Sequence, residues 1–317
     1  MRVLLTGSSG WLGRHLAPLL AEAGHEVTGL DVASGPHTRV TGSVADRDLV
    51  FQTVAHFGIE AVIHGGALHK PDIARNPRQA FVDANVTGTL NLLEAAVEAG
   101  HRRFVFTSTT SLMIRADVRA GAGEHGAWWM TEEFGPLAPR NVYGVTKLAA
   151  ENMCRIVSEE TGMAVAILRT GRFFPEEDDT HTDPPGENLK ANEFLNRRLS
   201  VADCARIHLA ALERIEGCEV LIASAPPPFS REEAEELARD APAVIARHFP
   251  DAAEVYALRG WLLPSRIERV YDPAKAERVL GWRARTDFAG ILAALREGRD
   301  LPLDHEPDFV SPVLSAR

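Results

Sequence analysis

The sequence predicts an α/β fold built on a doubly wound parallel sheet, and two observations carry this prediction. Short apolar runs rich in β-branched residues alternate with longer segments of helical periodicity. The runs are apolar at nearly every position, which indicates strands buried on both faces. Helical crossovers then cover both faces of the sheet. The expected strands are Arg2–Thr6, Glu26–Asp31, Ala61–His64, Phe104–Ser108, Ala164–Thr170 and Glu219–Ala223.

The expected helices lie between these strands, at Trp11–Ala23, Asp46–Phe57, Arg78–Ala99 and Val142–Thr161. After Gly171 the pattern changes, because residues 173–192 are rich in Pro, Asp, Glu and Asn and a Pro-rich break follows Ala225. We expect residues 1–175, completed by about 201–224, to form the sheet domain. Residues 176–200 and 225–317 should form a smaller lobe at the carboxyl edge of the strands, where such sheets bind ligands.

Composition narrows the possible partners. The chain has 317 residues and 45% hydrophobic content, enough for a large core. With 44 acidic and 34 basic residues, its net charge of −10 disfavours nucleic acid and anionic membranes. The first residues enter a strand without a signal-peptide pattern and no long apolar span is present, so we expect a cytoplasmic protein. The three cysteines, widely spaced, suggest neither a disulfide framework nor a zinc site.

A glycine-rich turn joins the first strand to the first helix and predicts a dinucleotide site. Gly7 and Gly10 allow a tight turn and let a pyrophosphate approach backbone N–H groups, while Gly13 lets the helix pack closely on the strand. This context makes the fold Rossmann-type. The turn residues expected at the cofactor are Gly7, Ser9, Gly10, Trp11, Leu12 and Gly13.

Asp31 ends the second strand, about 20 residues after the turn, where a ribose-binding carboxylate is needed. The Asp31 carboxylate would accept hydrogen bonds from ribose hydroxyls, and its negative charge would repel a 2′-phosphate. Residues 32–37 contain no arginine to bind such a phosphate, although Arg39 follows closely. We therefore expect NAD rather than NADP as the cofactor.

The GxxGxxG spacing resembles the extended short-chain dehydrogenases, the sugar epimerase/dehydratase family. Residues 64–67 (HGGA), 85–93 (NVTGTLNLL), 272–273 (DP) and 280–282 (LGW) resemble further motifs of that family. One departure is Ser43, which stands where the family usually has Asp, while Asp46 is out of register. The resemblance implies further cofactor contacts from Gly42, Ser43, Gly65, Gly66, Ala67, Asn85, Thr107, Tyr143 and Lys147.

Tyr143 and Lys147 form a YxxxK pair that shares one face of a helix. A tyrosine that titrates near pH 10 is a poor base at neutral pH, so a neighbouring ammonium that favours phenolate is useful. A third member, a hydroxyl after the fourth strand, is Thr109 when the family's pattern is aligned, with Ser108 as the alternative. The resemblance therefore implies Thr109, Tyr143 and Lys147 as the catalytic residues of a hydride-transfer enzyme.

The residues after Thr109 narrow the reaction. Dehydratases of the family place Asp-Glu there and decarboxylases place Glu, because their chemistry needs carboxylates, whereas this chain has Thr110 and Ser111. Two reactions remain: a nucleotide-sugar 4-epimerase of the UDP-sugar type, which we favour, or a dehydrogenase of a free sugar or sugar acid. The short segment before residue 199 resembles uronate dehydrogenases. A non-catalytic NAD-binding regulatory protein is a third possibility, against which Tyr143 and Lys147 count.

The substrate residues are inferred from position. Asn196 stands where epimerases place a phosphate-binding arginine, and arginines follow it directly. The expected substrate contacts are Thr109, Thr110, Ser111, Arg172, Asn192, Arg197 and Arg198, and the expected ligand is a small sugar or nucleotide-sugar. No metal is expected, because the acidic run 176–179 with His181 is typical of a solvated face.

Three further expectations concern aromatic residues, histidines and assembly. The Trp128-Trp129 pair could stack on a sugar but is more typical of packing, and His64 and His69 are expected to be structural or peripheral. The resemblance implies a homodimer through the helices Arg78–Ala99 and Val142–Thr161.

Overall fold

A seven-stranded parallel sheet organises the chain in a computed structural model that describes residues 1–173 and 185–303. Its strand order is β3-β2-β1-β4-β5-β7-β8, and every neighbouring pair is parallel. The reversal between β1 and β4 is the switch point at which doubly wound sheets bind ligands. The strands are β1 (Arg2–Thr6), β2 (Glu26–Asp31), β3 (Val40–Thr41), β4 (Ala61–His64), β5 (Arg103–Thr109), β7 (Ala164–Thr170) and β8 (Cys218–Ala223).

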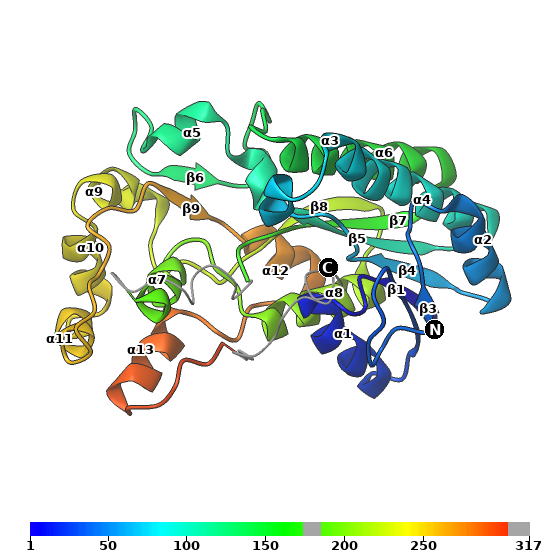
Figure 1. The fold of residues 1–317 in the computed structure, drawn as a ribbon. Coiled ribbons are helices and arrows are strands. Elements are labelled where there is room, and N and C mark those ends of the chain that lie inside the picture. The colour runs from blue at the N-terminus through cyan, green and yellow to red at the C-terminus, as the bar shows by residue number, and fades with distance from the viewer. Residues whose placement is uncertain (174–184, 304–317) are drawn as a thin grey trace.

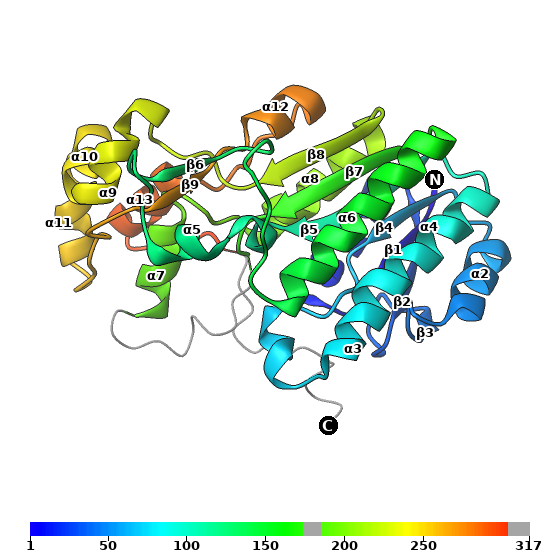
Figure 2. The ribbon, with the colours of Figure 1, turned by 90° about the horizontal axis from the view of Figure 1, so that it is seen from above.

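Helices cover both faces of this sheet, as doubly wound folds require (Figure 1). One face packs against α1 (Trp11–Glu22), α8 (Val201–Arg214) and α12 (Ala274–Leu280). The other is covered by α2 (Arg47–His56), α4 (Gly88–Glu98) and α6 (Val142–Thr161), which Figure 2 shows side by side across the strands. Separate apolar cores fill the two interfaces. The predicted fold class is confirmed.

The expected helix Arg78–Ala99 is interrupted in the structure. It begins as α3 (Arg78–Phe81), continues as a π-helical turn over Val82–Thr87, and becomes α4 at Gly88. Helical periodicity in the sequence does not reveal such a turn, because the extra residue is confined to a single turn and the apolar pattern is read over a longer window. The turn contains Asn85, whose side chain bonds both backbone groups of Leu68 beside the glycine turn.

A lobe lies beyond the carboxyl edge of the strands, at the left of Figure 1. Its two-stranded parallel sheet pairs β6 (Trp128–Met130) with β9 (Arg269–Tyr271). The strand β6 therefore belongs to the lobe, although we expected all of residues 1–175 in the sheet domain. Trp128 and Trp129 anchor this sheet through hydrogen bonds to Gly121 and Asp272. Its helices are α5 (Ala116–Ala120), α7 (Gly186–Glu193), α9 (Ala234–Arg239), α10 (Ala241–His248), α11 (Ala252–Ala257) and α13 (Phe288–Arg296).

Short 3₁₀ turns connect several elements: Lys70–Ala74, Thr110–Met113 and Arg231–Glu233. None of the helices within residues 1–173 and 185–303 has both the length and the apolar character needed to cross a membrane.

Candidate active site

The glycine turn after β1 forms the floor of a pocket at the switch point of the sheet. Gly7 has φ +75°, and a Cβ there would lie 2.8 Å from the backbone nitrogen of Gly66. A side chain at Gly13 would collide with the carbonyl oxygen of Gly7, so this glycine brings α1 against the turn. The turn therefore needs these glycines for close backbone approach, as a pyrophosphate site does.

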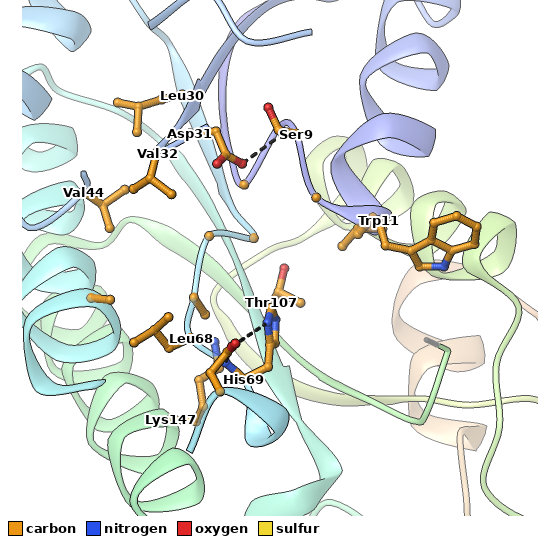
Figure 3. Close-up of a pocket in the computed structure, with 18 of the residues that line it drawn as sticks. Ser9, Trp11, Leu30, Asp31, Val32, Val44, Leu68, His69, Thr107 and Lys147 are labelled. Carbon is orange, nitrogen blue, oxygen red and sulfur yellow. Dashed lines mark hydrogen bonds and ion pairs between the residues drawn. The ribbon is translucent and has the colours of Figure 1, made fainter. Parts of the chain in front are cut away.

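The pocket runs from Asp31 and Val32 at one end to His69 and Lys147 at the other (Figure 3). Of the residues expected at a cofactor, all but two line it. The expected residues that do line the pocket are Gly7, Ser9, Gly10, Trp11, Leu12, Asp31, Gly42, Ser43, Gly65, Gly66, Ala67, Thr107, Tyr143 and Lys147. Gly13 and Asn85 lie behind this wall: Gly13 packs on the turn and Asn85 holds Leu68 and Thr146.

Asp31 is fixed at the adenosine end expected for a dinucleotide. Its carboxylate accepts hydrogen bonds from the backbone N–H groups of Ser9 and Ala33, both at 3.0 Å. The guanidinium of Arg39 lies over the ring of Phe57, 4.5 Å from its centroid, and does not line the pocket. The glycine cradle and this carboxylate fit NAD, and among the described residues of the lining no arginine offers a site for a 2′-phosphate.

Tyr143, Lys147 and Thr109 are brought together at the other end. Asn141 caps α6 by accepting the N–H of Gly144 at 2.9 Å, which places Tyr143 in the first helical turn. The Thr109 hydroxyl at the end of β5 lies near the Tyr143 phenol and lowers its pKa. One turn further along α6, the Lys147 ammonium lies 4.2 Å from the ring centroid of Phe106.

Ser108, the alternative to Thr109, is used elsewhere. Its hydroxyl donates to a Glu151 carboxylate oxygen at 2.5 Å, and the same carboxylate pairs with Arg169 at 2.7 Å in a buried network. An ion pair buried this completely is stable only with such additional hydrogen bonds. The Ser108 hydroxyl is thus committed to Glu151, and Thr109 is the hydroxyl that meets Tyr143.

Burial controls the ionisation of Tyr143 and Lys147. It raises the pKa of Tyr143 to about 12, against a smaller lowering by the hydrogen bond from Thr109. It lowers the pKa of Lys147 to about 7, opposed by the neighbouring Cys154 and Glu151. We expected the Lys147 ammonium to lower the pKa of Tyr143 and so favour its phenolate. In these residues alone, desolvation of the phenolate is the larger effect and the pKa is raised.

A second cavity, which we call the cleft, adjoins the pocket and shares His69, Tyr143 and Thr170 with it. Thr109, Thr110 and Ser111 line the cleft as predicted, together with Arg172 and Arg197. Its cationic side chains are Lys70, Arg119, Arg140, Arg172, Arg197 and Arg269, and within the described part of the chain its lining contains no carboxylate. Sequence reasoning did not identify Arg119, Arg140 or Arg269, since residues this far apart in the chain meet only in the folded lobe.

Arg198 and Asn192, two expected substrate residues, do not line the cleft. The Arg198 guanidinium is buried and pairs with Glu193 at 2.6 Å. Asn192 donates to the carbonyl oxygen of Leu262 at 2.9 Å and lines a further cavity of about 490 Å³. That outer cavity shares Arg172, Arg197 and Arg269 with the cleft, and Glu193 pairs with Arg197 at 2.7 Å and Arg172 at 3.4 Å.

The two histidines differ in their surroundings. His64 is buried between the hydroxyls of Thr6 and Thr89, and burial lowers its pKa to about 3. His69 lines both pocket and cleft, and its Nδ1 lies 3.9 Å from a carboxylate oxygen of Asp72. Sequence reasoning missed this acidic partner three residues away, although the spacing alone could have indicated it.

Outside the site, the remaining expectations have clear places. The acidic run 176–179 and His181 lie outside the described residues. In the portions that are described, no cluster of three His, Cys, Asp or Glu side chains could hold a metal ion. Trp128 and Trp129 are absent from the cleft lining and serve as packing anchors.

Comparison with known proteins adds relatives of several activities. A 3-beta-hydroxysteroid dehydrogenase of Mycolicibacterium neoaurum is 31% identical over 60% of this chain and 52% of its own length. A uronate dehydrogenase of Pseudomonas syringae pv. tomato is 28% identical over 55% and 60%, and a UDP-glucose 4-epimerase of Rhizobium meliloti is 25% identical over 91% and 94%. The chain spans about half the length of the steroid dehydrogenases that it matches.

A solved structure supports the fold over the whole chain. The UDP-glucose 4-epimerase of Thermus thermophilus, solved with NAD, superposes with a TM-score of 0.65 at 23% identity, covering 98% of this chain and 100% of that one. The model of the NAD dependent epimerase/dehydratase family matches residues 3–191, which is more than half of the chain. The chain therefore belongs to the NAD dependent epimerase/dehydratase family.

Proposed function

We propose that this enzyme oxidises a secondary hydroxyl of a nucleotide-linked sugar and re-reduces it, as a 4-epimerase of the UDP-sugar type. One observation carries the proposal: Tyr143 and Thr109 stand where the dinucleotide pocket meets the cleft. A sugar hydroxyl bound there would touch both side chains. Beyond the cleft, the outer cavity of about 490 Å³ offers room for the nucleotide end of the substrate.

In this mechanism Tyr143 accepts the proton of the sugar hydroxyl, while Thr109 donates a hydrogen bond to the same oxygen. Gly7, Gly10 and Asp31 would hold NAD, which when bound supplies the acceptor for the hydride from the sugar carbon. The high pKa of Tyr143, about 12, means that a nearby positive charge must favour its phenolate. Lys147, with a pKa lowered to about 7, carries part of that charge at neutral pH.

Elimination of water is disfavoured by the residues that follow Thr109. Thr110 donates to the carbonyl oxygen of Thr170 at 3.1 Å, and Ser111 donates its backbone N–H to the Thr109 hydroxyl. Neither side chain can act as the carboxylate acid or base that dehydration requires. Simple hydride chemistry fits these groups.

A dehydrogenase of a free sugar or sugar acid is the second candidate. It is favoured by the strongly cationic cleft, which would bind the carboxylate of a sugar acid. The same lining argues against a steroid, since an apolar ligand would have to desolvate six cationic side chains. A non-catalytic regulator is disfavoured, because Tyr143 and Lys147 are buried in a costly arrangement with perturbed pKa values.

Absorbance at 340 nm with added NAD tests these candidates, using UDP-sugars, dTDP-sugars, free aldoses and uronic acids as the panel. An inverted UDP-sugar without net NADH would support the epimerase, and steady NADH formation would support the dehydrogenase. Whichever activity is found, sugar inversion or NADH formation, it should be lost in Tyr143→Phe. If no member of the panel is converted in either way, the proposed function is wrong.

A further inference from the structure

Asp72, in the 3₁₀ turn Lys70–Ala74, places an acidic side chain in the wall of the dinucleotide pocket. Its carboxylate accepts the backbone N–H of His69 at 2.7 Å, and its carbonyl oxygen accepts the N–H groups of Arg75 and Asn76, both at 3.0 Å. These bonds close the turn on itself and fix the carboxylate against the backbone. The side chain is only 17% exposed. Asp72 is therefore a fixed negative charge in the pocket.

Little positive charge lies opposite this carboxylate. In the part of the chain that the structure describes, the imidazole of His69 is the one basic group within ion-pair distance, with its Nδ1 3.9 Å from Oδ2 of Asp72. Burial and the charge of Lys147 lower the pKa of His69 below its usual value, so this imidazole is neutral at pH 7. Lys147 itself, with a pKa lowered to about 7, carries only part of a charge. The negative charge of Asp72 is thus largely uncompensated.

Asp72 lies at the catalytic end of the pocket. The ring centroids of His69 and Tyr143 are 6.1 Å apart, so a single side chain separates the carboxylate from the catalytic phenol. The charge of Asp72 raises the pKa of Tyr143, as expected for two groups close enough to repel each other as anions. Asp31, the other carboxylate among the described lining residues, stands at the opposite end (Figure 3). NAD bound with its adenosine at Asp31 would therefore bring its nicotinamide to the end that holds Asp72.

The nicotinamide ring is positively charged when oxidised and neutral once it has accepted a hydride. A nearby carboxylate therefore stabilises the oxidised form selectively. We propose that Asp72 shifts the preference of the pocket from NADH toward NAD and so keeps the bound cofactor oxidised between turnovers. This inference rests on the proposed function, because a 4-epimerase must return the hydride to the keto sugar and end each cycle with NAD. A lower reduction potential of the bound cofactor favours that return.

Competition between the two cofactors tests the proposal without any sugar. The purified protein is equilibrated with equal concentrations of NAD and NADH, and the ratio of the two that remain bound is measured after rapid gel filtration. Asp72→Asn should lower the bound NAD:NADH ratio about five- to fiftyfold, the effect of one nearby charge at an effective dielectric constant of about 20. A tenfold fall corresponds to a reduction potential about 30 mV higher for this two-electron couple. The asparagine oxygen can still accept the N–H of His69, so the turn is retained.

Asp83→Asn is the matched control, because it makes the same change of charge on an exposed residue of the turn Val82–Thr87, outside the pocket lining. Its bound ratio should equal that of the wild type. ADP-ribose, which lacks the nicotinamide, reports whether the pocket keeps its shape. Its affinity should change less than about twofold in Asp72→Asn and in Asp72→Ser, since a serine hydroxyl can also accept the N–H of His69.

An unchanged NAD:NADH ratio in both Asp72 variants would overturn the proposal. A loss of ADP-ribose affinity as large as the loss of NAD affinity would overturn it too, because Asp72 would then only shape the pocket. Either result would leave the proposed function standing. Failure of every sugar in the wild type would overturn the proposed function, whereas the bound ratio, measured without sugar, would still decide the role of Asp72.

Discussion

The Oγ1 of Thr107 lies 2.8 Å from Nε2 of His208, inside the wall of the dinucleotide pocket. Nδ1 of the same imidazole lies 2.7 Å from the carbonyl oxygen of Cys204, which can only accept a hydrogen bond. Burial lowers the pKa of His208 to about 4, so the ring is neutral at pH 7, with its proton on Nδ1. Thr107 therefore donates to Nε2, and its oxygen faces the pocket as an acceptor.

We predict that His208→Leu weakens NAD binding about two- to tenfold, the value of one hydrogen bond, because the Thr107 hydroxyl loses its fixed direction. His208→Gln should retain most of the affinity, since its amide oxygen can take the place of Nε2. NAD titration by fluorescence measures the effect. Thr107→Val should lose as much NAD affinity as His208→Leu, and the double variant should bind NAD no more weakly than either single variant. If the two losses add in the double variant, His208 does not act through the Thr107 hydroxyl.

Tyr143→Phe should lower kcat by a factor of roughly 10²–10⁴, because it removes the proton acceptor and leaves the pocket intact. In the wild type, oxidation needs the phenolate. Since burial raises the pKa of Tyr143 to about 12, kcat/KM for oxidation should increase with pH from 6 to 9. Initial rates across this range measure it. A variant that retains a tenth of the activity, or the same pH profile, would exclude Tyr143 as the acceptor.

Asp31→Asn should weaken NAD binding about tenfold and narrow the preference for NAD over NADP. The loss follows from replacing a charged acceptor by a neutral one, and the narrowing from relieving repulsion of the 2′-phosphate. NAD titration by fluorescence measures the loss of affinity, and the ratio of kcat/KM for the two cofactors measures the preference. Asp46→Asn is the matched control: Asp46 caps α2 outside the pocket, and Asn caps helices equally well. Equal ratios in the two variants would contradict this role of Asp31.

The sequence predicted the central sheet well because buried parallel strands leave an unmistakable local pattern. The expected bounds of β1, β2, β4 and β7 agree with the structure, and α6 begins and ends where its apolar periodicity does. The two-residue β3 and the π-helical turn at Val82–Thr87 were missed, because neither changes the period of apolar residues over a long enough stretch.

The dinucleotide pocket was predictable for the same reason: its glycines and Asp31 follow consecutive strands. The cleft was not, because its cations depend on the pairing of β6 with β9 across some 140 residues of sequence. Arg269 and Arg119 carry no local signal of function. Arg197 and Arg198 are equivalent in the sequence. Both pair with Glu193 in the structure, but the guanidinium of Arg198 is buried while Arg197 lines the cleft, and only the folded chain shows this difference.

A homodimer through α4 and α6 remains a prediction. These helices form a groove whose apolar side chains include Leu90, Val97, Met153, Ile156 and Val157. Leu90, Val97 and Ile156 are at least 37% exposed, an apolar surface that a partner copy would cover. Ile156→Glu should convert the dimer into a monomer in light scattering, whereas Leu258→Glu, on the distant lobe, should not. A wild-type monomer at working concentration would refute the assembly.

Acid should destabilise the folded enzyme through its buried histidines. Burial lowers the pKa of His208 to about 4 and of His64 to about 3, whereas in the unfolded chain both titrate near 6.5. Below pH 6.5 the unfolded state therefore binds more protons than the folded state. Above this pH the two histidines do not reduce the free energy of unfolding. Below it, the free energy of unfolding should fall by about 1.4 kcal/mol per pH unit for each histidine as the pH approaches 4.

Urea unfolding at pH 7.5, 6.5 and 5.5 measures this slope. His208→Gln cannot take up the proton in either state, so its slope should be shallower by about the share of one histidine. His56→Gln is the control, because His56 is exposed on α2, and its slope should equal that of the wild type. If His208→Gln and the wild type lose stability in parallel, the buried imidazole at Thr107 is not held neutral, and the hydrogen-bond direction assigned to Thr107 falls with it.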